Sequence, residues 1–264
     1  MSRAVQIGFG KVDITPELEQ HEVYGLGYWS NRRMLFTGVR DRLHVRAAAV
    51  GEGSDLCFII SVDAIYDSFD FGKRACQQIA IEHNVSADRV FITCTHSHST
   101  PMTGLNNHDP QGDDAYGLFV SGRIVESARV AAASREGGEL VRMSAAVEDV
   151  ICNRRRVLKS GNVAEMFDDI DMADVMDPGP VNRTMTLLKA YASDGRFLGA
   201  FCHFGIHLVC VQATELISSD CMGRAIQRIE QEDKGGVVLH LNGACGDINP
   251  VAIGGEDDLE SIAR

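Results

Sequence analysis

A nearly continuous apolar run from Leu56 to Val62, ending in Asp63, constrains the fold of this 264-residue chain more than any other segment. Such runs are typical of strands buried on both faces of an α/β sheet. A helix is predicted over 68–83, and a second β-prone run follows at 90–92. This alternation of strand and helix predicts an α/β fold, with a single mixed sheet and helices packed on it.

The rest of the chain continues this pattern. Apolar residues recur every three or four positions at 114–135 and 220–232, which predicts helices, and further strands are predicted over 140–147, 184–191, 199–204 and 237–241. Residues 148–182 read as a long, acidic surface loop. A helix starts near Glu256 but has only about two turns before the last residue, and so short a helix is marginal without further packing. We therefore expect residues 1–264 to be one domain that forms the N-terminal part of a longer chain.

Composition excludes several classes of function. The net charge of −12 argues against a nucleic-acid partner. None of the eight cysteines forms a Cys-x-x-Cys pair, which disfavours a zinc ribbon or a thioredoxin motif. We see neither a signal peptide nor an apolar run long enough to cross a membrane, and we expect a cytoplasmic protein. The sequence does not define an oligomeric state.

Two histidines, His96 and His98, follow the β-prone run at 90–92. Residues two apart in an extended chain point to the same face, so the two imidazoles can converge on one metal ion, or on a metal and its substrate. Histidine is the commonest metal ligand in proteins. The alternative is a pair of solvated loop histidines, because the His-x-His pattern is short and frequent. This segment predicts a metal site at the C-terminal ends of strands.

A second pair, His203 and His207, lies at the end of the strand predicted over 199–204. A histidine there is usually a satisfied core residue, but together with His96 it becomes a plausible metal ligand. Catalytic zinc sites commonly use three protein ligands and keep one position open for water.

Three other features are candidates for chemistry. The basic cluster at 153–156 (Asn-Arg-Arg-Arg) is either a solvated face or an anchor for an anion. The glycine-rich turn at 243–247 follows a predicted buried strand and can supply N–H donors to a ligand. Asp63, at a strand end, either caps a turn or orients a ligating histidine.

Six blocks of sequence occur in a defined order: Gly8–Pro16 (GFGKVDITP), Asp41–Ala47 (DRLHVRA), Thr95–Ser99 (THSHS), Asn153-Arg154, Phe201–His203 with Leu216–Asp220 (FCH…LISSD), and Gly246–Pro250 (GDINP). In this order and spread, they resemble the neutral/alkaline, non-lysosomal ceramidase family, specifically its N-terminal catalytic domain. The resemblance covers nearly the whole chain.

This resemblance implies a zinc-dependent amidohydrolase that cleaves the N-acyl bond of ceramide to sphingosine and fatty acid, an activity of sphingolipid metabolism. It implies His96 and His203 as zinc ligands, with the remaining ligands, a Glu and a Tyr, beyond Arg264. His98 and Arg154 match residues assigned to substrate or transition-state contacts, and Asp247 and Asn249 lie in the last catalytic motif. The expected mechanism is attack by metal-activated water, with His98 as general acid/base and Arg154 balancing the developing negative charge.

Two departures from the family pattern matter. Asn249 stands where the family carries Ser, and an amide cannot be an acyl nucleophile, although it can donate a hydrogen bond to an oxyanion. The segment between His203 and Leu216 is longer than expected, so His207 is an alternative to His203. The expected partner is a lipid or small-molecule amide. The alternatives are a zinc-binding family member without turnover and a hydrolase of a small polar amide or ester.

Overall fold

The computed structural model describes residues 5–26, 33–65, 69–103, 114–164, 168, 170–212, 214–233 and 235–264. These residues confirm the α/β prediction with one mixed, eight-stranded sheet in the order β16-β14-β13-β8-β1-β5-β6-β7. Its strands are β1 (Val5–Asp13), β5 (His44–Val50), β6 (Cys57–Val62), β7 (Val90–Cys94), β8 (Glu136–Ala146), β13 (Thr184–Ala192), β14 (Phe197–Phe204) and β16 (Val237–Asn242). Within this sheet, only the pairs β6–β7 and β14–β16 are parallel.

The predicted helices are also present. They are α1 (Phe69–His83), α2 (Asp114–Ala133), α3 (Asp220–Glu232) and α4 (Glu256–Ala263), and short 3₁₀ turns lie at Gly53–Asp55, Ala87–Arg89 and Met172–Asp174. Residue 68, the predicted first residue of α1, lies outside the described residues. The unit β6-α1-β7 is therefore a parallel crossover, as the alternation of apolar run and helical period at 56–92 predicts.

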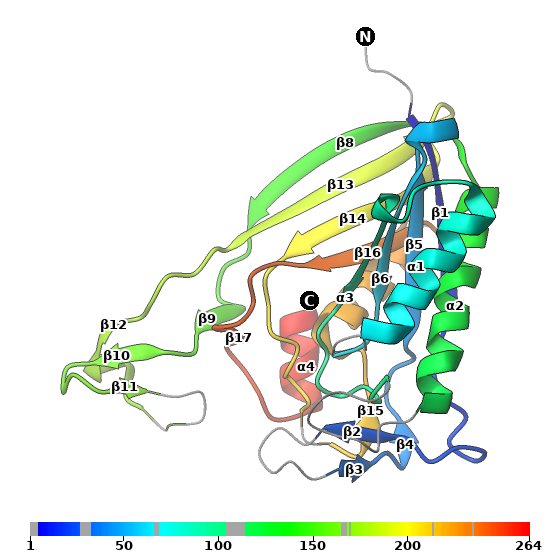
Figure 1. Ribbon diagram of the computed structural model, residues 1–264. Coiled ribbons are helices and arrows are strands. Elements are labelled where there is room, and N and C mark those ends of the chain that lie inside the picture. The colour runs from blue at the N-terminus through cyan, green and yellow to red at the C-terminus, as the bar shows by residue number, and fades with distance from the viewer. Residues whose placement is uncertain are drawn as a thin grey trace.

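The sheet folds over on itself, so that one half packs against the other. In Figure 1, β8, β13, β14 and β16 run across β1, β5 and β6. Strand β16 contacts β5, β6 and β7 across the fold, and the Ser61 hydroxyl on β6 donates to the carbonyl of His240 on β16. An apolar cluster that includes Phe9, Phe201 and Leu239 fills the space between the two halves. This packing brings the end of β7 close to the ends of β14 and β16.

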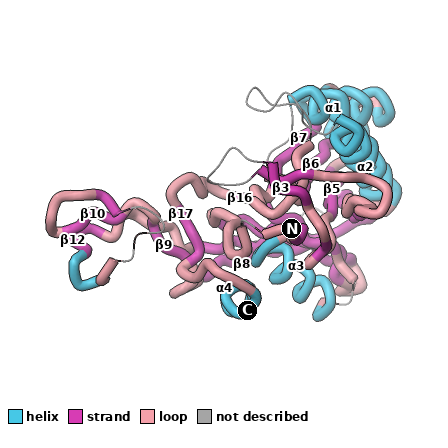
Figure 2. Tube along the Cα trace, turned by 90° about the horizontal axis from the view of Figure 1, so that it is seen from below, coloured by secondary structure: helices cyan, strands magenta, loops and turns pink. Residues whose placement is uncertain are grey.

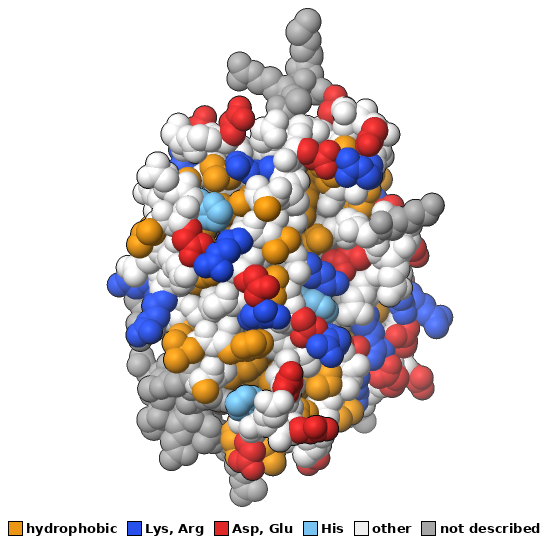
Figure 3. All heavy atoms as spheres, turned by 90° about the vertical axis from the view of Figure 1, so that its right-hand side faces the viewer, with side chains coloured by type: hydrophobic (Ala, Val, Ile, Leu, Met, Phe, Trp, Pro, Cys, Tyr) orange, Lys and Arg blue, Asp and Glu red, His pale blue; other side chains and the backbone are white. Residues whose placement is uncertain are grey.

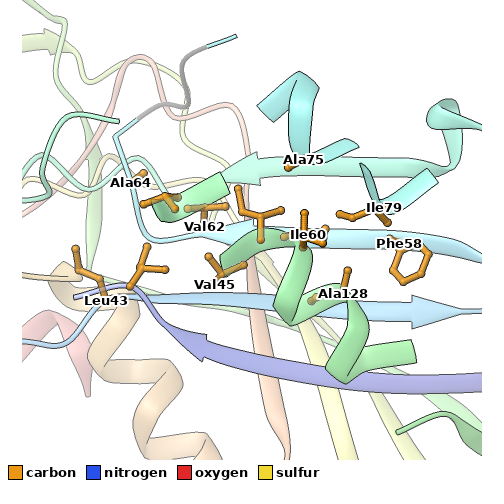
Figure 4. Close-up of a cluster of buried hydrophobic side chains, with 14 of the residues drawn as sticks. Leu43, Val45, Phe58, Ile60, Val62, Ala64, Ala75, Ile79 and Ala128 are labelled. Atoms are coloured by element: carbon orange, nitrogen blue, oxygen red, sulfur yellow. The ribbon is translucent and has the colours of Figure 1, made fainter. Parts of the chain in front are cut away.

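Helices cover both outer faces of the folded sheet. Helices α1 and α2 pack on β1, β5, β6 and β7 over a large apolar cluster. Figure 4 shows part of it, including Leu43, Val45, Phe58, Ile60, Val62, Ala64, Ala75, Ile79 and Ala128. Glycines make the close approach of α2 possible, because a Cβ on Gly10 of β1 would lie 2.4 Å from the carbonyl oxygen of Ser127. Helices α3 and α4 pack on the β14–β16 side over a second cluster.

The interpretation of 148–182 as an irregular loop was wrong for much of its length. The segment contains β9 (Ile151–Asn153), which pairs with β17 (Ile248–Pro250), and a small sheet of β10 (Arg156–Leu158), β11 (Val163–Ala164) and β12 (Val175–Asp177). Figure 2 shows β10 and β12 projecting from the body of the molecule. These strands are too short to give a periodic signal, and β9 pairs with a segment distant in sequence. Residues 165–167 and 169 lie outside the described part.

Two further strand pairs complete the fold. They are β2 (Tyr24–Leu26) with β3 (Arg33–Leu35) and β4 (Gly38–Val39) with β15 (Leu216–Ile217). Figure 3 shows acidic and basic side chains interspersed on the face that carries α1 and α2, without a large patch of one sign. In the part of the chain that the structure describes, no helix is both long and apolar enough to span a bilayer.

Candidate metal centre

The segment after β7 holds His96 in an unusual backbone conformation. The φ angle of His96 is +69°, in the left-handed region, where a non-glycine residue costs on the order of 1–3 kcal/mol. The amide of His96 donates to the carbonyl of Ala64 and that of His98 to the carbonyl of Leu208, which fixes both ends of the turn. Strain of this kind clusters at functional sites, because the surrounding structure must be built to hold it.

A second turn, after β14, brings in His207. Its backbone amide donates to the carbonyl of Ile248 at 2.8 Å. Asn242, the last residue of β16, joins the two turns, because its Nδ2 donates to the carbonyls of both Thr95 and Ile206. Hydrogen bonds therefore hold the loops after β7, β14 and β16 together close to the ends of these strands.

Three imidazoles meet where these loops join. The Nε2 atoms of His98 and His207 lie 2.9 Å apart, and the ring centroids of His96 and His207 are 4.6 Å apart. Ligand atoms of His96, His207 and Cys245 all lie within 4.8 Å of one another. Two nitrogens that each lie about 2.0–2.1 Å from one zinc ion are separated by a distance similar to that between the Nε2 atoms of His98 and His207. The group therefore offers a mixed nitrogen and sulfur donor set, which suits zinc.

Backbone carbonyls orient two of these rings. The Nδ1 of His96 is 2.7 Å from the carbonyl of Ile65, and the Nδ1 of His207 is 3.0 Å from the carbonyl of Cys245. Since a carbonyl only accepts, each Nδ1 carries the proton and each Nε2 keeps its lone pair. A carbonyl behind a histidine in this way is the usual support for a metal ligand.

The site also favours the neutral form of His98 and of His207. Burial lowers the pKa of His98 to about 3, with smaller contributions from His207, His96 and Arg154. Burial likewise lowers the pKa of His207 to about 4, although its bond to the Cys245 carbonyl opposes the shift. A neutral imidazole is the form that binds a metal ion.

The structure brings together His96, His98 and His207, but it places His203 elsewhere. His203 is exposed on β14, packs beside Gly243 and is not part of the group around His96. Cys245 is a member of that group that the sequence analysis did not single out. Its only signal was its position in the glycine-rich turn after a predicted strand.

The remaining predicted residues fall into two groups. Arg154 and Asn249 both line a cavity of about 200 Å³ at the junction of β9 and β17. Asp247 binds the end of β9. Its carboxylate accepts a hydrogen bond from the side-chain amide of Asn153, and its backbone carbonyl accepts one from the backbone amide of Arg154. Asp63 does not orient a histidine ring. Its Oδ2 accepts from the backbone amide of His44 and from Arg46 Nη1 at 3.0 Å, and its side chain is buried.

A second group of possible ligands has a structural explanation. Cys210, Asp220 and Cys221 are buried together, with ligand atoms within 4.8 Å. The carboxylate of Asp220 already accepts from the backbone amides of Cys210, Val211 and Cys221. These bonds hold the N-terminus of α3 against the loop that follows His207.

The family model described as "Neutral/alkaline non-lysosomal ceramidase, N-terminal" matches residues 5–252. The chain belongs to this ceramidase family. The resemblance in the six sequence blocks is thereby confirmed. A comparison with curated protein sequences gave no significant match.

Solved ceramidase structures share the fold. Neutral ceramidase from Pseudomonas aeruginosa is 21% identical with a TM-score of 0.80, and the match covers 100% of this chain and 43% of that one. A structure described as "Ceramidase complexed with C2" is 22% identical with a TM-score of 0.81, covering 99% and 42%. The chain thus spans less than half the length of these ceramidases.

Proposed function

We propose that the protein is a zinc-dependent hydrolase that cleaves a linear N-acyl amide, the type of bond found in ceramide. The observation that carries this proposal is the convergence of His96, His98 and His207 at strand ends in a chain of the ceramidase family. Zinc as the metal and the N-acyl amide as the substrate both belong to the proposal.

The donor set supports zinc. His96 and His207 would hold the ion through Nε2, since each Nδ1 is committed to a backbone carbonyl. Cys245 is the third candidate ligand within reach, although burial raises its thiol pKa, and thiolate formation would need the cation. A zinc ion held there supplies Lewis-acid chemistry, which activates water at neutral pH and polarises a carbonyl group.

The other residues handle the proton and the substrate. His98 is neutral at pH 7 and lies beside His207, so its ring can accept a proton from the attacking water and return it to the leaving amine. Arg154 is close enough for its charge to lower the pKa of His98, and it provides the positive charge for the substrate side of the site. Asn249 cannot form an acyl-enzyme, so hydrolysis proceeds by direct attack of water.

The test uses purified full-length protein and a fluorogenic N-acyl amide. Dialysis against a chelator should abolish hydrolysis, and added zinc should restore it. His96→Ala should remove turnover both after dialysis against the chelator and after zinc is added. A trappable acyl adduct, or full activity in metal-free protein, would overturn the mechanism. Zinc binding without hydrolysis of any amide or ester would instead favour a ligand-binding role.

A further inference from the structure

The cavity beside Asn249 is built by two short strands and the turns that extend them. Cys152 on β9, Arg154 between the two strands and Arg156 at the start of β10 all line it. Asn249 on β17 pairs directly with Cys152 on β9. Pro250, Val251 and Ile253 complete the lining of this cavity of about 200 Å³. Figure 1 shows β9 and β17 side by side where the β10–β12 sheet leaves the body.

Two polar groups at this cavity are buried without partners. The side chain of Asn249 is 1% exposed, and neither its Oδ1 nor its Nδ2 has a hydrogen-bond partner among the described residues. The Nε of Arg156 is likewise buried and unpartnered within that part of the chain. Buried polar groups are nearly always paired, and leaving three such atoms unpaired is unfavourable. A ligand in the cavity that both donates and accepts hydrogen bonds would give these atoms the partners they lack.

The charge at the cavity is positive. Two guanidinium groups line it, and no carboxylate does so among the described residues. The nearby carboxylate of Asp247 is engaged by Asn153. Arginine forms two parallel bonds with a carboxylate, so this lining favours a planar anion.

The cavity is connected to His207 through the backbone of β17. Asn249 follows Ile248, whose carbonyl accepts the backbone amide of His207. A ligand bound at Asn249 therefore lies one residue along the strand from the contact that positions His207. The volume of the cavity is below the roughly 300–1,000 Å³ of typical ligand sites, so the cavity can hold a small head group but not a whole lipid.

We propose that this cavity binds the carboxylate head of an N-acyl amino acid, and that the enzyme releases the free amino acid. Arg154 and Arg156 bind the carboxylate together with Nδ2 of Asn249, while Oδ1 of Asn249 accepts the N–H of the scissile amide. Water adds to the acyl carbon, the C–N bond breaks, and a proton from water passes to the departing amine. The acyl chain lies outside the cavity. This inference rests on the proposed amide hydrolysis.

The test compares two substrates with the same acyl chain, an N-acylglycine and an N-acylethanolamine, which differ in a carboxylate against a hydroxymethyl group. The full-length zinc-loaded protein should favour the N-acylglycine in kcat/KM by about 10- to 100-fold, the worth of a charge-assisted hydrogen bond. Arg156→Gln should reduce that preference about tenfold or more, and Arg156→Lys, which keeps the charge but not the planar fork, should give an intermediate value.

Arg155→Gln is the matched control. Arg155 is exposed and does not line the cavity, so its loss removes the same charge without touching the site. This variant should keep the wild-type preference. A wild-type preference for the ethanolamide, or equal effects of the two glutamine variants, would overturn the proposal. Thermal unfolding confirms that each variant is folded.

A binding measurement separates this inference from the proposed function. Calorimetry with N-acetylglycine needs no turnover, so it decides the question even if neither amide is hydrolysed. Binding should be weakened by Arg156→Gln and not by Arg155→Gln. Inorganic phosphate that binds as tightly as N-acetylglycine would mark a general anion site and contradict carboxylate recognition, as would no binding of either ligand.

Discussion

The Nε2 atoms of His98 and His207 lie 2.9 Å apart although 109 residues separate them in the chain. The backbone explains this contact. Residues Ser97 and Leu208 form a parallel β-bridge, and the His98 amide donates to the Leu208 carbonyl. The two loops can form this bridge because the sheet folds over and brings the end of β14 to the end of β7.

Replacing His207 should distinguish the two candidate ligands on β14 and its loop. We expect His207→Ala to weaken zinc binding by more than the roughly 10–100-fold seen when a supporting outer residue is lost, because it removes a ligand atom itself. His203→Ala should leave the affinity near the wild-type value, since His203 is exposed and outside the group around His96. Competition with a chromogenic chelator gives both affinities.

The reverse result would restore His203 as the ligand that the resemblance implies. His98→Ala provides a third comparison. If His98 serves the proton and not the ion, this variant should keep zinc and lose turnover. Loss of zinc would instead assign His98 as a ligand, a role that its 2.9 Å separation from His207 also permits.

The sequence predicted the elements whose signal is local. The apolar run before Asp63 and the helical period of α3 each lie within one segment, and both elements are present. Strands β1 and β5 were not predicted, because glycines and alanines replace large apolar residues in them and admit helix α2. The alternation of buried side chains between the two faces of these strands can be recognised only when the helix that covers them is known.

The site could be predicted in part for the same reason. His96 and His98 stand out because the motif is short and follows a clear strand. The choice between His203 and His207 depends on where β14 ends and on which face each side chain takes, and a strand boundary is not fixed to that accuracy by propensity. Cys245 lies in the group because the sheet folds over on itself, and no local pattern in the sequence predicts that arrangement.

Gly10 should be essential to the contact between β1 and α2. We expect Gly10→Ala to lower the free energy of unfolding by about 1–3 kcal/mol or more, because its Cβ would meet the backbone of α2 at 2.4 Å and neither element can move independently. Gly137→Ala is the control, since the nearest atom to its added Cβ is 3.8 Å away. Urea unfolding of the two variants should differ clearly, and equal stabilities would contradict this account of the interface.

Arg46 should be critical for stability, because it is the buried cation that pairs with two buried carboxylates. It is 2% exposed, and it pairs with Asp63 at 3.0 Å and with Glu230 at 3.2 Å. Arg46→Met leaves the buried carboxylate of Asp63 without a cation, which should cost about 3–5 kcal/mol in urea unfolding. Arg196→Met, which removes an exposed pair with Glu136, should cost less than about 1 kcal/mol.

A double variant checks the cause of that loss. Arg46→Met combined with Asp63→Asn removes the stranded charge, so it should recover part of the stability lost by Arg46→Met alone. If the double variant is less stable than the single one by the full cost of a second substitution, packing of the arginine and not the charge explains the effect.

His240 should make stability depend on pH. It is fully buried on β16, and burial lowers its pKa to about 4 from 6.5, although the bond from Nε2 to the Phe204 carbonyl opposes the shift. Between pH 6.5 and pH 4 the unfolded chain therefore binds a proton that the folded chain does not. Stability falls as the pH drops through this window, by on the order of 2 kcal/mol between pH 7 and pH 5 from this residue.

His240→Gln tests this directly, because the glutamine amide can donate to the Phe204 carbonyl but does not titrate. Urea unfolding at pH 7 and pH 5 should show a smaller loss of stability in the variant than in the wild type, by about that 2 kcal/mol. His21→Gln is the control: it removes an exposed histidine and leaves the buried imidazole of His240 in place, so the wild-type pH dependence should persist. An unchanged loss in His240→Gln would mean that other groups, and not this buried imidazole, set the acid limit of the fold.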